Sequence, residues 1–263
     1  MSFDIEDWFQ MFYGEKVVSK SSWDSQPTEL PKMIESTLEF LDSKNITATF
    51  FVVGWLAKKH PNQIKEIKKH GHEVASHGYW HTQIYKQNLR EFRADLRRSK
   101  AELEDAIGSG VYGYRAPGYS VLRGGYEILE EIRDAGYLYD SSYMYSESGA
   151  TIIDGLAEIT PNSISFAGRR YPVNGGFVFR FLPYLLWKKL IDLQLNDEVR
   201  RLAFYTHSWE IYPPINRIEL NFVKNFIQYN NIESVHGKIN KLVEDFQFTS
   251  ALKILQDTGK FNQ

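Results

Sequence analysis

Apolar segments alternate with amphipathic segments along most of the chain. Seven short apolar runs have the length and composition of β-strands, and TATFFVVG is the clearest because it is apolar on both faces. The predicted strands are Ser2–Glu6, Ala48–Gly54, Glu73–Ser76, Gly113–Arg115, Leu138–Asp140, Ala157–Thr160 and Leu202–Thr206. Helical spacing of apolar residues predicts helices between them, at Pro31–Lys44, Leu89–Ile107 and Gly124–Ala135. This alternation predicts an α/β fold built on a parallel sheet or barrel.

Two regions depart from this alternation. Residues 161–182 combine apolar residues with glycine-bearing turns, which predicts a β-hairpin inserted beside the main scaffold. Towards the C-terminus, amphipathic segments lie at Glu233–Phe246 and Ser250–Asp257. We therefore predict one catalytic barrel over residues 1–212, which includes the hairpin, and a helical C-terminal extension over residues 213–263 packed on that barrel.

The composition is that of an ordinary globular protein, with 43% hydrophobic and 24% charged residues in 263. Net charge is −2 and no run of Lys and Arg is dense enough to indicate a nucleic-acid surface, so no nucleic-acid partner is predicted. The chain contains no cysteine, which excludes disulfides, thiolate catalysis and thiolate metal ligands. Any metal ion must therefore be held by histidine and carboxylate side chains.

The longest apolar stretch, residues 177–187, is interrupted by Arg180 and Pro183 and falls short of the roughly 20 apolar residues that cross a bilayer. No transmembrane segment is predicted. The chain begins MSFDIEDWFQ, with acidic residues where an export signal carries basic and then apolar ones. We accordingly expect a cytoplasmic protein, acting in solution or at the inner face of the membrane.

Four of the seven histidines lie in HGHEVASHGYWH, residues 70–81. His77 and His81 are four residues apart, so on a helical turn, or in a loop folded like one, both imidazoles face one point and can bind a single ion. The alternative is a pair of solvated or hydrogen-bonded histidines. His70 and His72 flank the start of a predicted strand and are interpreted as structural.

Acidic residues cluster at the end of the first predicted strand, in SFDIEDWF. Asp4 and Glu6 point to the same face of an extended strand, whereas Asp7 reaches that place only if the chain turns after Glu6. Carboxylates so close together repel one another unless a cation lies among them or one of them is protonated. The alternative is a helix or turn cap at the surface.

Two further segments carry candidate catalytic side chains at predicted strand ends. In YRAPGYS, Arg115 precedes a proline–glycine turn and could hold an aspartate ionised through a bidentate pair. In FYTHSWE, His207 closes an apolar strand. Each residue alone is explained by a surface salt bridge or a core histidine. Together with two histidines and a carboxylate around a divalent metal, they are the groups needed for metal-assisted hydrolysis of an amide or ester.

These segments resemble those of the polysaccharide deacetylases with NodB homology, carbohydrate esterases that remove N-acetyl groups from sugars on a distorted (β/α)7 TIM-like barrel. The resemblance extends from residue 2 to about residue 250 and is greatest for the branch associated with exopolysaccharide biosynthesis. The matching motifs, in collinear order, are FDIEDWF, SHGYWH, RRSKAELED, YRAPGYS, YDSS, RYPVNGGFVFRFLPY and FYTHSWE.

The resemblance implies a role for each motif residue. Asp4 matches the catalytic base, His77 and His81 match the metal-binding histidines, Arg115 matches the arginine that tethers the base, and His207 matches the general acid. It also implies one divalent cofactor, with Zn²⁺ expected and Co²⁺, Ni²⁺ or Mn²⁺ as alternatives. The implied substrate is an N-acetylhexosamine in a bacterial glycan or its lipid-linked precursor.

The remaining positions are less fixed by the resemblance. Tyr119 and Trp209 lie in motifs that line the sugar and acetyl pocket, so we predict that they bind substrate. Most family members have two adjacent aspartates where this chain has Asp4 followed by Ile5, so the acidic metal ligand is Glu6 or Asp7. Two other functions share the fold: a catalytically silent glycan-binding or assembly protein, and a metal-free hydrolase of cyclic amides, whose known forms lack the paired histidines.

Overall fold

A computed structural model describes residues 1–145, 149–153, 155–195, 202–212 and 216–259 of the chain. Its main sheet has the strand order β10-β1-β2-β3-β4-β5-β7-β6. The first seven strands in this order are parallel to their neighbours, and β6 is antiparallel to β7. The strands are β1 Ser2–Ile5, β2 Thr49–Val52, β3 Glu73–Ser76, β4 Gly113–Tyr114, β5 Tyr139–Asp140, β6 Gly149–Ile153, β7 Leu156–Thr160 and β10 Tyr205–His207. The predicted α/β class and the seven parallel strands are confirmed.

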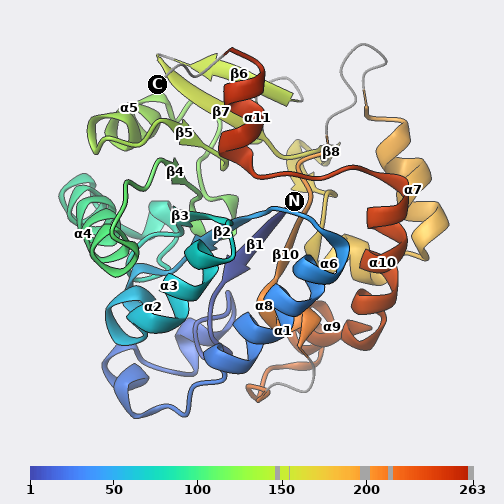
Figure 1. Ribbon diagram of the computed structural model, residues 1–263, viewed down its shortest axis with the longest axis horizontal. Helices are drawn as coiled ribbons and strands as arrows, with labels where there is room; N and C mark the ends of the chain where they lie inside the picture. Colours follow the sequence, from blue (N-terminus) through green and yellow to red (C-terminus); the bar gives the residue numbers. More distant parts are fainter. Residues whose placement is uncertain (146–148, 154, 196–201, 213–215, 260–263) are drawn as a thin grey trace.

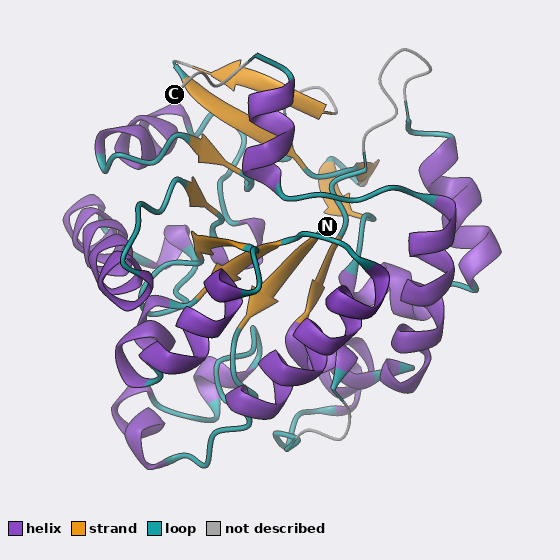
Figure 2. Cartoon of the chain, viewed as in Figure 1, coloured by secondary structure: helices purple, strands orange, loops and turns teal. Residues whose placement is uncertain are grey.

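Helices cover the outer face of this sheet, which curls into a half-barrel (Figures 1 and 2). The helices of the first half are α1 Leu30–Lys44, α2 Gly54–Lys59, α3 Pro61–Lys69, α4 Leu89–Ile107 and α5 Tyr126–Asp134. Helix α4 has the predicted bounds because Asn88 and Glu91 form a capping box at its start and Gly108 adopts a left-handed conformation at its end. Short 3-10 helices lie at η1 Gly14–Lys16, η2 Lys20–Ser25, η3 Ile84–Lys86, η4 Pro117–Tyr119 and η5 Ile232–Ser234.

The predicted hairpin insertion is only partly right. Strands β8 Ser163–Phe166 and β9 Arg169–Pro172 do form an antiparallel hairpin, but the chain then enters helices α6 Gly176–Phe181 and α7 Tyr184–Asp192. Gly175 lies so close to β10 that a Cβ there would be 1.9 Å from the carbonyl oxygen of Tyr205, so only glycine fits at this position. The phenylalanines of GFVFRF lie at every second position, which is the spacing of a strand, so the sequence pattern concealed this helix.

The C-terminal part of the chain is helical, as predicted. Its helices are α8 Ser208–Ile211, α9 Phe222–Tyr229, α10 Val235–Asp245 and α11 Ala251–Asp257. Helices α10 and α11 correspond to the two predicted amphipathic segments. The segment between them crosses the molecule, so that α11 lies beside β6 and β7 (Figure 1). The division into a barrel and an extension at residue 213 falls within residues 213–215, which lie outside the described ranges, and stays a prediction. Within the described ranges, no helix has the length and apolar character needed to span a bilayer.

Candidate active site

The predicted base and acid lie opposite each other on neighbouring strands. The parallel pairing of β1 with β10 puts the Cα of Asp4 beside that of His207, at the carboxyl ends of both strands. The Asp4 side chain is buried, and Arg115, which follows β4, donates a hydrogen bond from Nη1 to Asp4 Oδ1 at 2.7 Å. Burial by itself would raise the pKa of Asp4, but Arg115, together with the nearby His77 and His207, more than offsets this and lowers it. Asp4 is therefore ionised.

Arg115 is fixed from several sides. Its Nη1 also donates to Ser2 Oγ at 3.0 Å, its Nη2 donates to Ser141 Oγ at 3.0 Å, and its guanidinium lies 3.9 Å from the centre of the Phe51 ring. These contacts come from β1, β2 and the segment after β5. Since the arginine cannot rotate away without breaking them, it holds Asp4 in one orientation.

The two predicted metal-binding histidines lie together, in a loop after β3 rather than on a helix. Their ring centres are 4.9 Å apart. The Nδ1 of His77 is 2.8 Å from the carbonyl oxygen of Arg115, so the proton on Nδ1 leaves Nε2 unprotonated and 3.9 Å from Asp4 Oδ2. Burial is the main cause that lowers the pKa of His77 to about 4. A neutral imidazole with an unprotonated Nε2 is the form that ligates metals.

Asp95, which the sequence analysis did not single out, shapes this loop. Its carboxylate accepts hydrogen bonds from the backbone N–H of Tyr79, at 2.7 Å, and of Trp80, at 3.0 Å. The loop also needs an unusual conformation at His81, whose φ is 52°. The sequence did carry a signal for this role, because Asp95 lies between Phe92 and Leu96 on the buried stripe of α4.

The structure separates the two candidate acids of the first motif. Glu6 Oε2 lies 3.0 Å from His81 Nε2, and Glu6 Oε1 lies 3.4 Å from His207 Nε2. Asp7 points elsewhere: it accepts hydrogen bonds from Thr28 Oγ1 at 2.6 Å and from the backbone N–H of Trp8 at 2.8 Å. Glu6 is thus the acid that faces the histidines, and Asp7 holds the loop that follows β1.

The donor set fits a divalent cation in kind and in pairwise spacing. Glu6 Oε2 is buried and accepts no hydrogen bond from the described residues, and two imidazoles with one carboxylate are ligands that Zn²⁺ prefers. Among the described residues, however, no three side chains of His, Asp or Glu are already arranged around one common point. A cation shared by His77, His81 and Glu6 would therefore require these side chains to rotate.

His207 is held by a carboxylate and an arginine that the sequence analysis missed. Glu210 Oε2 lies 3.2 Å from His207 Nδ1 and accepts the backbone N–H of the same histidine at 2.9 Å, while Arg180 donates from Nη1 to Glu210 Oε1. Burial by itself would lower the pKa of His207, but the carboxylates of Glu210, Glu6 and Asp4 together more than offset this and raise it to about 9. His207 is therefore protonated at neutral pH, and it is the site histidine with the greatest exposure, at 20% of its side chain.

The two predicted substrate contacts are both buried. Trp209 stacks on the His207 ring, with centres 4.7 Å apart, and donates from Nε1 to Glu6 Oε1 at 3.3 Å. Tyr119 lies against Tyr205, with ring centres 5.2 Å apart. Trp209 thus contacts both His207 and Glu6. A role of Trp209 or Tyr119 in binding sugar stays a prediction.

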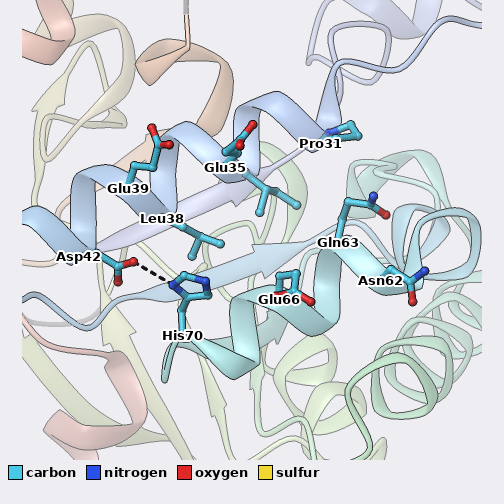
Figure 3. A pocket seen from close by; sticks show the side chains of 10 residues that line it. Pro31, Glu35, Leu38, Glu39, Asp42, Asn62, Gln63, Glu66 and His70 are labelled. Atoms are coloured by element: carbon cyan, nitrogen blue, oxygen red, sulfur yellow. Dashed lines mark hydrogen bonds and ion pairs between the residues drawn. The ribbon is translucent and has the colours of Figure 1, made fainter.

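The remaining histidines of the motif lie away from the site. The Nδ1 of His70 is 2.9 Å from Asp42 Oδ2, across a groove between α1 and α3 that is lined by carboxylates (Figure 3). His72 Nδ1 accepts the backbone N–H of Ala48 at 3.4 Å. Their structural interpretation agrees with these positions.

Two family models match successive parts of the chain. Residues 14–139 match the family model described as polysaccharide deacetylase, and residues 136–256 match one described as a domain of unknown function, DUF3473. Residues 14–139 are thus a polysaccharide deacetylase domain. The first matched range includes His77, His81 and Arg115, whereas Asp4 precedes it and His207 lies in the second range. The resemblance drawn from the motifs is thereby confirmed at the level of the family.

Two curated relatives match parts of the chain. A peptidoglycan-N-acetylglucosamine deacetylase from Bacillus cereus is 33% identical over 85 residues, which are 32% of this chain and 31% of the relative. A protein of the same description from Listeria monocytogenes is 30% identical over 95 residues, which are 36% of this chain and 20% of the relative. The matched segments thus span a third or less of these relatives.

A solved structure resembles the whole chain. A Mycobacterium smegmatis structure described as a polysaccharide deacetylase has a TM-score of 0.65 at 20% identity and covers 100% of this chain and 90% of its own. At this identity the likeness concerns the fold. It confirms the predicted barrel of the polysaccharide deacetylase type.

Proposed function

We propose that this chain is a metal-dependent N-deacetylase that hydrolyses the N-acetyl group of an N-acetylhexosamine in a bacterial glycan or its precursor. The proposal rests on one observation: neighbouring strands β1 and β10 carry a negatively charged and a positively charged side chain side by side. Asp4 is kept ionised by Arg115, and His207 is kept protonated by Glu210. A base and an acid held at neighbouring strand ends are what amide hydrolysis requires, because one proton must leave the water and another must reach the amine.

The residues have distinct tasks in this reaction. His77, His81 and Glu6 would hold the cation, for which Zn²⁺ is expected; when bound, it supplies Lewis acidity to the amide carbonyl and lowers the pKa of water. Asp4 accepts the proton of the attacking water at Oδ2, since Oδ1 is occupied by Arg115. His207 donates the proton on Nε2 to the departing amine nitrogen, because Nδ1 faces Glu210.

The substrate class rests on two supports. Both curated relatives described above are named as deacetylases of N-acetylglucosamine in peptidoglycan. The motifs also resemble those of the branch associated with exopolysaccharide biosynthesis. We therefore propose a β-linked N-acetylglucosamine oligomer, or a lipid-linked sugar carrying the same acetamido group, as the first substrate to test.

The test is release of acetate by zinc-loaded protein from a panel of N-acetylglucosamine oligomers. We expect Asp4→Asn to lower kcat by at least about 10²-fold, the usual contribution of a general base, while the protein still binds zinc. Glu6→Gln should lose zinc, measured by elemental analysis after dialysis. Asp7→Asn is the matched control and should retain zinc and acetate release, because Asp7 does not face the histidines.

Three outcomes would overturn parts of the proposal. Sugar binding by calorimetry without acetate release, identical in the wild type and Asp4→Asn, would instead support a catalytically silent glycan-binding protein. Hydrolysis of a cyclic amide that persists after zinc is removed would support the metal-free alternative. Zinc loss in Asp7→Asn but not in Glu6→Gln would show that the assignment of the acidic ligand is wrong.

A further inference from the structure

Two acidic side chains are buried beside each other on β5 and β7, which are neighbours in the main sheet (Figure 1). The parallel pairing of these strands places the Cα of Asp140 beside that of Glu158, so both side chains lie on the same face of the sheet. Asp140 is fully buried and Glu158 is 1% exposed. Arg115 is the basic residue whose charge acts on Glu158, but it forms its ion pair with Asp4. We call Asp140 and Glu158 the carboxyl pair.

The carboxyl pair is held together by a hydrogen bond between its two members. A carboxylate has only acceptor oxygens, so such a bond requires one of the two groups to keep its proton. Glu158 Oε2 is buried and accepts no hydrogen bond from the described residues, whereas both oxygens of Asp140 accept hydrogen bonds from Ser142. Burial is the main cause that raises the pKa of Glu158 well above its usual range, and the adjacent Asp140 raises it further. These observations place the proton on Glu158 Oε2.

The carboxyl pair also holds residues 141–143, the turn that follows β5. Asp140 Oδ2 accepts the backbone N–H of Ser142 at 2.9 Å, and Asp140 Oδ1 accepts the hydroxyl of the same serine at 2.7 Å. Glu158 Oε1 accepts the backbone N–H of Tyr143 at 3.1 Å. The turn is therefore anchored to two strands of the sheet through these two acids.

This turn in turn holds Arg115. Ser141 Oγ accepts a hydrogen bond from Arg115 Nη2 at 3.0 Å, and the carbonyl oxygen of Ser141 accepts one from Arg115 Nε at 3.4 Å. Ser142 Oγ accepts the backbone N–H of Ala116, the next residue along the chain, at 2.6 Å. Since Arg115 donates to Asp4, a continuous set of hydrogen bonds links the carboxyl pair to the proposed base.

We propose that Asp140 and Glu158 share one proton and act as positioning residues, because they orient the turn that fixes Arg115 and, through it, Asp4. The positioning role rests on the proposed deacetylase function, whereas the shared proton does not. A neutral Glu158 donates to Asp140 and adds no second negative charge that would attract Arg115 away from Asp4. An ionised Glu158 would do neither.

Infrared spectroscopy of the folded chain tests the shared proton without any substrate. A protonated carboxyl group absorbs at a higher frequency than a carboxylate, so the wild type at neutral pH should show a carboxylic acid band that Glu158→Gln lacks. Glu210→Gln is the matched control: Glu210 is equally buried, but Arg180 and His207 outweigh burial and lower its pKa to about 2. That control should lose only carboxylate absorption. The same acid band in the wild type and in Glu158→Gln would overturn the shared proton.

Acetate release by zinc-loaded variants tests the positioning role. Glu158→Ala should lower kcat about tenfold or more with KM nearly unchanged, because the turn loses an anchor while no contact with the sugar is removed. Glu158→Gln should keep kcat close to the wild type, since its amide donates to Asp140 and its oxygen accepts the N–H of Tyr143. Ser142→Ala is a second and smaller change, and it should lower kcat in the same way because it breaks the link to Ala116.

The remaining outcomes each contradict a definite part of the proposal. Wild-type kcat in both Glu158→Ala and Ser142→Ala would overturn the positioning role. Equal loss of kcat in Glu158→Gln and Glu158→Ala, with both folded by circular dichroism, would show that Glu158 acts as an anion and would contradict the shared proton. If the wild type itself released no acetate but showed the acid band, the proposed function and the positioning role would fail together and the shared proton would stand.

Discussion

His72 is a buried imidazole whose charge is suppressed by its surroundings. Its ring packs on Phe50, with centres 5.2 Å apart, and its Nε2 has no hydrogen-bond partner among the described residues. Burial lowers the pKa of His72 from 6.5 to about 4, although Asp42 acts in the opposite direction. Between these pH values the unfolded chain binds a proton that the folded chain does not, so the free energy of unfolding decreases as pH falls from 6.5 towards 4.

His72→Asn should reduce this pH dependence. The Asn side-chain oxygen can occupy the place of Nδ1 and accept the N–H of Ala48, but the amide does not titrate. We expect the loss of stability between pH 7 and pH 5, measured as a shift in urea midpoint, to be smaller in His72→Asn than in the wild type. His236→Asn is the control, because that ring is already exposed in the folded chain. An unchanged pH dependence in His72→Asn would contradict the assignment.

Residue types and spacing were enough to find most of the candidate site. The pair His77 and His81, and the groups Asp4 and Arg115, could be named because each lies in or just after a strand that is recognisable from its apolar pattern. The choice between Glu6 and Asp7 could not be made. It depends on where β1 ends and on Thr28, a distant residue that captures the Asp7 carboxylate.

At the scale of elements, the junction of β10 with α8 determines how the proposed acid is held. Glu210 is the third residue of α8, and its carboxylate accepts the backbone N–H of His207, the residue that precedes the helix, at 2.9 Å. The same carboxylate therefore starts a helix and orients an imidazole. Its partner Arg180 lies on α6, in a segment that the sequence analysis assigned to a hairpin, so the contact between the two could not be foreseen.

Glu210→Gln should lower kcat at least about tenfold with little change in KM. The substitution removes the negative charge that stabilises protonated His207, and general acid catalysis contributes about 10²–10⁴-fold to such reactions. KM should be unaffected because Glu210 is buried beneath the histidine. Steady-state kinetics of acetate release provide both constants.

Thr206→Val is the matched control for Glu210→Gln. Thr206 Oγ1 donates to Glu210 Oε2 at 2.6 Å, so its removal disturbs the same carboxylate but leaves the charge in place. We expect a lower unfolding temperature with kcat close to the wild type. If both variants lost kcat equally, Glu210 would have only a structural role.

Over the whole molecule, helix α11 closes the end of the half-barrel opposite the candidate site. Leu255 is buried in a small core with Phe51, Ala75, Tyr139 and Ala157, which belong to four strands of the main sheet. The amphipathic pattern of residues 250–257 predicted the helix, but not where it packs. Polar side chains of the strands hold its start: Thr49 Oγ1 accepts the N–H of Ala251 at 2.7 Å, and Glu73 Oε2 accepts the N–H of Leu252 at 3.0 Å.

Leu255→Ala should therefore destabilise the entire domain and not only its last helix. Loss of a fully buried leucine leaves a cavity and is expected to lower the free energy of unfolding by about 2–5 kcal/mol. Because the cavity would lie between strands that also carry the candidate site, sheet and site should unfold together, in a single urea transition followed by circular dichroism and by acetate release. Leu193→Ala, at an exposed leucine, should change stability by no more than about 0.5 kcal/mol. A variant that loses α11 early while the sheet retains wild-type stability would show that the helix is an appendage and not part of the core.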